Sequence, residues 1–496
     1  MLRAPFPSRN FAPLRDCFVS SGQVLQKWQC SASTCEACGN EIAAIGLDLA
    51  MSEKGHAAIT IEKTRWLTLV LVTLSVGFAS GLGGMGLGLL LHLVQHITYG
   101  HGPHTMAGQQ SFLQEVTGAS DLRRFLALCS CGAVAGIGWW LLYRFGTPLV
   151  SIRQAVRKGG RMPFGATLTH AILQIVTVGL GSPLGREVAP RELGAALATK
   201  LSVRASLTPE YTRTMIACGA GAGLAAVYNV PFGGTLFTLE VLLGTFSLSA
   251  SVAALATCVI ATLVAQLGLG NGLQYSVPPL AISPSIIVWS LLVGPVIGAA
   301  AYLFVRVTEA ARARAPRDWH LAVWCGLVFP MIGLLAIPFP QLLGNGKGLA
   351  QAGFDSEVGL ALAATLLLFR VVVLVASLRA GAEGGLLTPG LSIGALLGII
   401  LGSFWNHVWP TALLADFAIV GGAAFLASSM KMPLTAIVLT VELTGIDQKF
   451  LVPLSLAVAG SVSIFHLCRA YADQLMRAPA TIRDSERTPE AVSAGD

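Results

Sequence analysis

The chain has 496 residues, of which 54% are hydrophobic and only 11% are charged, and it contains 55 glycines. This composition excludes an ordinary soluble globular protein and indicates a membrane protein with several crossings. The net charge of +7 gathers in a few short clusters instead of one basic face, which argues against nucleic acid as a partner.

Residues 1–60 read as an N-terminal leader that is either disordered or the product of a start site placed too early. Met51 begins a segment typical of a chain's start, and the leader lacks the apolar core of a signal peptide. A tetrahedral metal site here would need a fourth ligand such as Cys17 or His56, and no second CxxC pair is present. We therefore expect no metal at the C-x4-C-x2-C spacing formed by Cys30, Cys35 and Cys38.

Apolar segments follow one another along the rest of the chain. Several are shorter than the roughly 20 residues that a full crossing needs, so some helices must be partial or re-entrant. The sequence therefore predicts an all-α polytopic membrane domain over 61–478 and a disordered polar tail over 479–496. The segments are 66–97, 121–145, 164–184, 191–203, 211–245, 249–268, 283–305, 320–343, 356–378, 389–408, 414–428, 433–445 and 450–468.

The basic residues predict the orientation of this domain. They cluster near 153–161, 204–213 and 306–317 and after the last apolar segment, whereas the loops at 98–120, 269–282 and 405–415 contain no Lys or Arg. Because cytoplasmic loops carry the excess of positive charge, we expect the basic loops and both termini to be cytoplasmic.

One hydrophobic pattern occurs twice. Gly219 to Leu242 reads GAGAGLAAVYNVPFGGTLFTLEVL, and Gly421 to Thr444 reads GGAAFLASSMKMPLTAIVLTVELT. Setting Pro231 on Pro433 also sets Glu240 on Glu442. The chain is therefore read as a duplication, with repeat 1 at about 65–270 and repeat 2 at about 280–475.

A glycine-led loop that ends in proline precedes each copy: GREVAP at 185–190 and GGLLTP at 384–389. Each loop opens an apolar helix, whose free amides and positive dipole end can hold an anion without a formal positive charge. An ordinary helix start would show the same proline and glycine signals. Their occurrence at matching places in two repeats favours an anion site between two opposed broken helices.

Glu187, in the first loop, admits two interpretations. A carboxylate at a helix N-terminus is often only a favourable partner for the dipole, worth about 0.3–1 kcal/mol. An ionisable group between apolar segments, however, is a functional-site hypothesis by default. Such a carboxylate could occupy the anion's place when ionised and leave it when protonated, which would make Glu187 a gate.

These motifs together resemble the CLC family of chloride channels and chloride–proton antiporters over about 65–475. GREVAP resembles that family's gating loop, usually GREGP or GKEGP, and GGLLTP resembles its GGIFAP loop. GAGAGLAAVYNVPFGGTLFTLE resembles the family's helix-G-to-H region, and KMPLTAIVLTVELTG resembles its APLTGIILVLEMT stretch. The resemblance implies an inverted-repeat fold of broken and re-entrant helices. Because the polar tail after about residue 478 is too short to be a domain, we expect no cytoplasmic regulatory domain.

The resemblance also assigns residues. Glu187 matches the gating glutamate, and Leu386 and Leu387 match positions whose backbone amides face the central ion. Tyr471 matches the tyrosine that closes the inner side of the site, and Thr147 stands for a serine there, with Ser151 as the fallback. The implied anion-binding set is Thr147, Glu187, Val188, Ala189, Leu386, Leu387 and Tyr471.

Departures from the family's pattern bear on mechanism. Pro190 comes one residue late, which changes the set of free amides, and Leu387 replaces an aromatic residue. Val241 stands where proton-coupled members carry the glutamate that receives protons from the cytoplasm, so the sequence favours a passive, voltage-gated-type chloride channel. The alternatives are a chloride–proton antiporter and a fluoride–proton antiporter of the same family. Thr147 argues against the second, because fluoride-exporting members usually carry asparagine at this position.

Further expectations come from the resemblance: a homodimer in the lipid bilayer of a bacterial inner membrane, with chloride or a similar monovalent anion as substrate, and no cofactor. An enzyme is not expected. An intramembrane hydrolase would need a nucleophile and a base within reach, and His170 and Ser182 are the only tempting pair.

Overall fold

The computed structural model describes residues 32–100, 111–280, 282–410 and 412–477, and it describes side chains from residue 66 to residue 474 within these ranges. This part of the chain is helical, and its β-type pairing is one isolated antiparallel bridge between Gly185 and Gly385. The predicted all-α fold is confirmed. The chain divides into two compact units, Met1–Leu67 and Thr68–Asp496.

Helix α1 (Ala32–Tyr99) runs through the leader's predicted end at residue 60. The extent of the leader therefore stays a prediction. The tail at 479–496 lies outside the described residues, as do Cys17 and Cys30 and the side chains of Cys35, Cys38 and His56.

Repeat 1 continues from α1 into a series of long and short helices. Their bounds are α2 (Phe112–Gly118), α3 (Asp121–Phe145), α4 (Ile152–Lys158), α5 (Phe164–Gly179), α6 (Val188–Arg204), α7 (Pro209–Tyr228), α8 (Pro231–Leu236), the π-helix η1 (Phe237–Leu243) and α9 (Leu248–Leu269).

Repeat 2 has a similar succession of elements. They are α10 (Pro284–Ala313), α11 (His320–Leu335), the 3-10 turn η2 (Pro340–Leu342), α12 (Lys347–Phe354), α13 (Leu360–Ala380), α14 (Leu387–Val408), α15 (Leu414–Met430), α16 (Pro433–Thr444), the 3-10 turn η3 (Gln448–Phe450) and α17 (Leu451–Arg477).

Seven stretches of the described helices are long and apolar enough to cross a membrane: Trp66–Tyr99, Asp121–Phe145, Leu248–Leu269, Pro284–Ala313, Leu360–Ala380, Leu387–Val408 and Gln448–Gln474. Shorter apolar helices lie between them, such as α5, α11 and α16. The protein is thus a multi-pass membrane protein that also contains the short helices expected from the sequence.

The apolar segment at 211–245 is not one helix. It breaks after Tyr228, where Asn229 takes a left-handed conformation (φ 58°), and α8 starts at Pro231. Repeat 2 breaks in the same way at Lys431, also with φ 58°, before Pro433. Proline lacks the N–H that would continue the preceding helix, so both breaks follow from the sequence.

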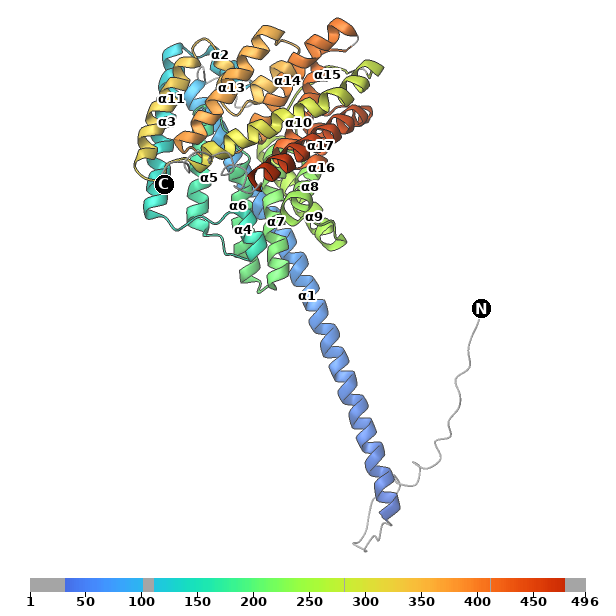
Figure 1. Ribbon diagram of the computed structural model, residues 1–496. Coiled ribbons are helices and arrows are strands. Elements are labelled where there is room, and N and C mark those ends of the chain that lie inside the picture. Colours follow the sequence, from blue (N-terminus) through green and yellow to red (C-terminus); the bar gives the residue numbers. More distant parts are fainter. Residues whose placement is uncertain (1–31, 101–110, 281, 411, 478–496) are drawn as a thin grey trace, which may run out of the picture. The chain divides into compact units, whose positions relative to one another are not determined.

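Small residues let the helices that lead away from the two loops pack closely. In repeat 1, α6 meets α7 at Gly194 and Gly219, where a Cβ on either residue would run into the other's carbonyl oxygen. In repeat 2, α14 lies beside α15 (Figure 1). Gly394 and Gly421 meet there in the same manner. These pairs hold α6 against α7 and α14 against α15, and they therefore help to set the directions in which α6 and α14 run.

The two repeats complete each other's helix ends. Glu240 accepts hydrogen bonds from the backbone N–H groups of Leu434 (3.0 Å) and Thr435 (2.8 Å) and from the Thr435 hydroxyl (2.6 Å), at the start of α16. Glu442 makes the reciprocal contacts with the first two N–H groups of α8, those of Phe232 (3.0 Å) and Gly233 (2.6 Å). Contacts exchanged in this way are the mark of a two-fold relation between the repeats.

Candidate functional site

Glu187 lies between the two repeats. It is the residue immediately before α6, and its side chain is fully buried. Its Oε1 accepts a hydrogen bond of 2.5 Å from the N–H of Leu387, the first residue of α14. Its Oε2 is buried and has no hydrogen-bond partner among the described residues. The carboxylate of one repeat thus sits on the helix N-terminus of the other.

The bridge between the two loops holds this carboxylate in place. Gly185 N–H donates to the Gly385 carbonyl at 2.8 Å, and Gly385 N–H donates to the Gly185 carbonyl at 2.9 Å. A Cβ on either glycine would collide with the Glu187 carboxyl group. Glycine at both positions therefore leaves room for the carboxylate to lie between the two loops.

The amides that the sequence assigns to anion binding lie at the two helix starts. Val188 and Ala189 are the first two residues of α6, and Leu386 is the residue before α14. The first N–H groups of a helix have no acceptor within the helix, so they are free to bind another group. Because Pro190 has no N–H, the donors of α6 are restricted to the residues before it.

Arg370, on α13, holds the first loop in place through hydrogen bonds to backbone carbonyls. Its guanidinium is fully buried and donates to the carbonyls of Leu342 (3.0 Å), Gly344 (2.9 Å) and Pro183 (3.0 Å). A buried guanidinium with three carbonyl partners resists displacement, because any movement would leave a charge without hydrogen bonds. The loop that carries Glu187 is therefore anchored to the segment before α12.

Arg191 and Glu192 are neighbours on α6, and each side chain has a different partner. Arg191 is buried, and its Nε donates to the Glu187 carbonyl oxygen at 2.8 Å. Glu192 pairs instead with His170 on α5, at 2.7 Å. Among the described side chains, no cation forms an ion pair with the Glu187 carboxylate. The backbone of the opposing helix is what holds it.

Comparison with known proteins agrees with this geometry. A profile of the family described as voltage gated chloride channel matches residues 126–466. The chain belongs to that family. A voltage-gated ClC-type chloride channel, ClcB, of Citrobacter koseri is 29% identical over 68% of this chain and 82% of its own length. The ClcB of Escherichia coli is 30% identical with the same coverage.

Solved structures share the fold. A slow cyanobacterial Cl⁻/H⁺ antiporter superposes with a TM-score of 0.70 at 21% identity, covering 81% of this chain and 95% of that one. A CLC-type fluoride/proton antiporter gives 0.59 at 21% identity and covers 81% and 97%. The predicted CLC-type fold is confirmed, and the chain is one of this family's transporters or channels for anions.

Two residues assigned through the family resemblance lie away from the Glu187 carboxylate's contacts. Thr147 is exposed in the turn between α3 and α4, and Ser151, the fallback, caps α4 by accepting from Gln154 N–H. Tyr471 is 64% exposed near the end of α17. In the described part of the chain, neither Thr147 nor Tyr471 makes a side-chain hydrogen bond to the site, and their roles stay predictions.

Val241 and Glu240 take different positions on η1. Val241 is partly buried and packs against the main hydrophobic core. The Glu240 carboxylate is occupied by its three hydrogen bonds to α16. Neither residue therefore supplies a free carboxyl group on the path to Glu187.

The pair that a hydrolase would need is not assembled. His170 Nδ1 contacts Glu192 at 2.7 Å and Gln174 at 2.9 Å. The Ser182 hydroxyl accepts from the N–H of Leu184 at 3.5 Å. Since His170 is engaged with Glu192 and Gln174, it does not activate Ser182 as a nucleophile.

Tyr228 and Thr388 are site residues that the sequence did not single out. Both are buried, and their hydroxyl oxygens lie 3.0 Å apart, joining the end of α7 to the first turn of α14. Arg186 lies over the Tyr228 ring at 5.1 Å. The position of Tyr228 just before the helix break is the one sequence signal that could have drawn attention to it.

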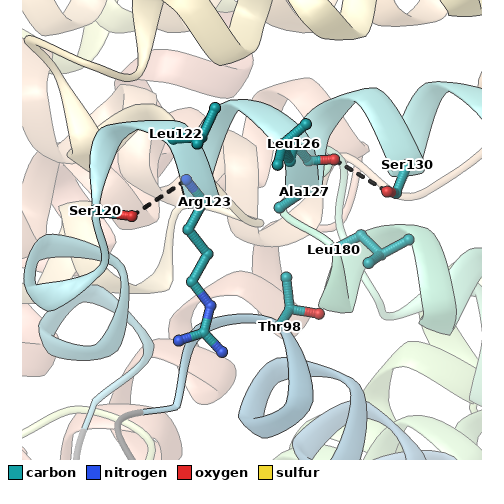
Figure 2. A pocket seen from close by; sticks show the side chains of 8 residues that line it. All are labelled: Thr98, Ser120, Leu122, Arg123, Leu126, Ala127, Ser130 and Leu180. Atoms are coloured by element: carbon teal, nitrogen blue, oxygen red, sulfur yellow. Dashed lines mark hydrogen bonds between the residues drawn. The ribbon is translucent and has the colours of Figure 1, made fainter.

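A pocket of about 350 Å³ opens at another place, between the end of α1 and the start of α3. Figure 2 shows the Arg123 side chain extending past Thr98, with Leu180 on the far side. The residues that line it include none assigned to anion binding, so we give this pocket no part in transport.

Proposed function

We propose that this protein conducts chloride, or a similar monovalent anion, through a pore that Glu187 gates. The observation that carries the proposal is the hydrogen bond from Leu387 N–H to the Glu187 carboxylate. That amide is one of the donors that the family resemblance assigns to the ion. An ionised carboxylate on it therefore occupies an anion's place.

Opening follows from the same chemistry. A protonated Glu187 is a weaker acceptor for backbone amides, and a competing anion can then take its position. Neutral backbone donors at two helix ends bind an anion weakly enough to release it, which rapid conduction requires. The buried Oε2 has no hydrogen-bond partner among the described residues, and this also favours departure, because an unpaired carboxylate oxygen inside a protein is costly.

We propose passive conduction as the mode of transport. Val241 cannot carry a proton, and Glu240 is engaged in capping α16. Coupled exchange is the alternative, since two of the superposed structures are described as antiporters, but at 21% identity they bear on the fold alone. The ClcB relatives are described as voltage-gated chloride channels.

We further propose that the chain forms a homodimer in a bacterial inner membrane with both termini cytoplasmic. The distribution of basic loops supports the orientation. Large apolar side chains on α9 and α17 that are exposed, such as Leu263 and Leu467, support contact with lipid or a second copy.

The decisive experiment is chloride efflux from liposomes that contain purified Glu187→Ala protein. Without the carboxylate the amides stay available, so efflux should equal or exceed that of the wild type at neutral pH, and its dependence on pH should weaken. Abolished efflux in a variant that still folds and assembles would refute the gating role.

A further inference from the structure

Arg186, Lys347 and Gln274 come together beside the gate from three separate segments. Arg186 precedes Glu187 in the first loop, Gln274 lies in the loop after α9, and Lys347 is the first residue of α12. Arg186 Nη2 donates to Gln274 Oε1 at 3.4 Å, and Lys347 Nζ donates to the same oxygen at 3.2 Å. Two cationic side chains therefore share one neutral acceptor.

We infer that these three side chains form a second binding site for a monovalent anion, adjacent to the Glu187 site and distinct from it. The inference extends the proposed anion pathway and rests on it only for the choice of a halide as ligand. The backbone amides of α6 and α14 form the first site, whereas the side chains of Arg186, Lys347 and Gln274 form the second.

The balance of charge carries the inference. Among the described side chains, no ion pair includes Arg186 or Lys347. Arg186 is only 8% exposed, and Lys347 is partly buried. Two like charges so close together in a medium of low polarity repel each other strongly, and a neutral amide oxygen does not compensate for them. A bound anion would.

Free donors also point toward a ligand. Arg186 Nε is buried and has no hydrogen-bond partner among the described residues. Because both cations can only donate, the Gln274 atom that faces them is its oxygen, and its NH₂ group is left to donate elsewhere. Within the described chain, no acceptor takes a hydrogen bond from that NH₂ group. An anion is the ligand that accepts from all of these groups.

The Tyr228 ring keeps the site rigid. Arg186 lies over this ring, and the Tyr228 hydroxyl is fixed by Thr388 at the start of α14. Since Arg186 and Glu187 are consecutive, an anion bound to Arg186 would lie next to the Glu187 carboxylate, whose position it must take. The site would raise the local anion concentration at the gate, as charged clefts do for their ligands.

Crystals of the wild-type protein grown in bromide would locate the site directly. We expect an anomalous bromide peak in contact with Lys347 Nζ and Arg186, separate from any peak at the Leu387 amide. Bromide confined to the amide site would overturn the inference. This measurement needs no variant and does not depend on transport.

Chloride titrations of efflux would test its role. Arg186→Gln and Lys347→Gln should each raise the half-saturating chloride concentration by roughly three- to ten-fold, more at low ionic strength. Lys347→Arg keeps the charge and should restore the wild-type value. Lys449→Gln is the matched control, because Lys449 is an exposed lysine outside the proposed site. Its segment follows Gly445, which lies next to Leu273, the residue before Gln274.

The outcomes separate the two proposals. Wild-type efflux with an unchanged half-saturating concentration in both charge-removing variants would refute the second site and leave the Glu187 gate intact. Absent efflux in the wild type, with bromide bound at Lys347, would refute the proposed transport and leave the site intact. Equal shifts in Lys449→Gln and Lys347→Gln would show a general surface-charge effect, which also refutes the site.

Discussion

At the scale of single residues, the absence of two side chains makes room for the carboxylate that we propose as the gate. Gly185 and Gly385 leave room for the Glu187 carboxylate only because neither has a Cβ. Neither glycine has a positive φ, so alanine could adopt the same backbone conformation there. A substitution at Gly385 would therefore act mainly on the carboxylate.

Gly385→Ala should displace the Glu187 side chain and open the pore. We expect chloride efflux well above the wild type, toward the level of Glu187→Ala. Gly165→Ala is the control, because no atom of the described residues lies within 4 Å of the added methyl group there. The decisive comparison is in the Glu187→Ala background, where Gly385→Ala should have no further effect. A fall in efflux in that background would mean that the methyl group itself obstructs the anion.

Lys347 should make anion binding sensitive to pH. Burial and the nearby charge of Arg186 lower the pKa of Lys347 to about 8. Arg186 is the charged group that acts on it, and an arginine side chain stays protonated in proteins. Below its pKa Lys347 is a cation, and as pH rises through that value the charge is lost. By linkage, a bound anion raises the pKa of Lys347 in return.

Chloride affinity should therefore fall by roughly three- to ten-fold as pH rises from about 7 to about 9. Calorimetric titration of the purified protein with chloride would measure it. Lys347→Arg should bind with little dependence on pH over this range. A wild-type affinity that stays constant over the same range would contradict the assignment of Lys347 to the site.

At the scale of helices, the sequence predicts features that depend on neighbouring residues, and it misses features that depend on residues far apart in the chain. The starts of α6 and α14 follow from local signals, namely glycine, proline and the onset of an apolar run, and both were placed correctly. The breaks before Pro231 and Pro433 are just as local, yet the uniform hydrophobicity of 211–245 concealed the first. Arg370, Gln274 and Lys347 gave no signal, because their partners lie at least 26 residues away.

The caps at α8 and α16 are the contacts between repeats that can be tested one at a time. Glu240→Ala removes three hydrogen bonds from the start of α16 and should destabilise the protein by about 1–2 kcal/mol. Thermal unfolding in detergent would measure this. Glu357→Gln, at an exposed position, should leave stability unchanged. Unchanged stability in Glu240→Ala, together with altered proton movement, would instead place Glu240 on a proton path.

At the scale of the whole molecule, the constant offset of 202 residues between Glu240 and Glu442 predicted a duplication, and the reciprocal caps agree with it. The pairing of the two loops through Gly185 and Gly385 follows from the same two-fold relation. The offset gave no information on which residues of the two repeats contact each other. These contacts are formed by side chains that are far apart in the sequence and come together only when the chain folds.

The mode of transport is a property of the whole protein. If no titratable group connects the cytoplasm to Glu187, a chloride gradient should drive little or no uphill proton movement. The reversal potential in a planar bilayer should then equal the chloride equilibrium potential at any pH gradient. A reversal potential that shifts steadily with the pH difference would instead require a fixed exchange ratio, and the protein would be an antiporter.

The exchanged caps also mean that one helix end is synthesised long before the residue that caps it. The first amides of α8 receive their acceptor from Glu442, which lies 209 residues later in the chain. At a synthesis rate of about 5–20 residues per second, these amides stay uncapped for roughly 10–40 s after they are made. Repeat 1 thus enters the bilayer before the acceptor for the first amides of α8 has been synthesised. Until then, water, lipid headgroups or a chaperone must cover these amides.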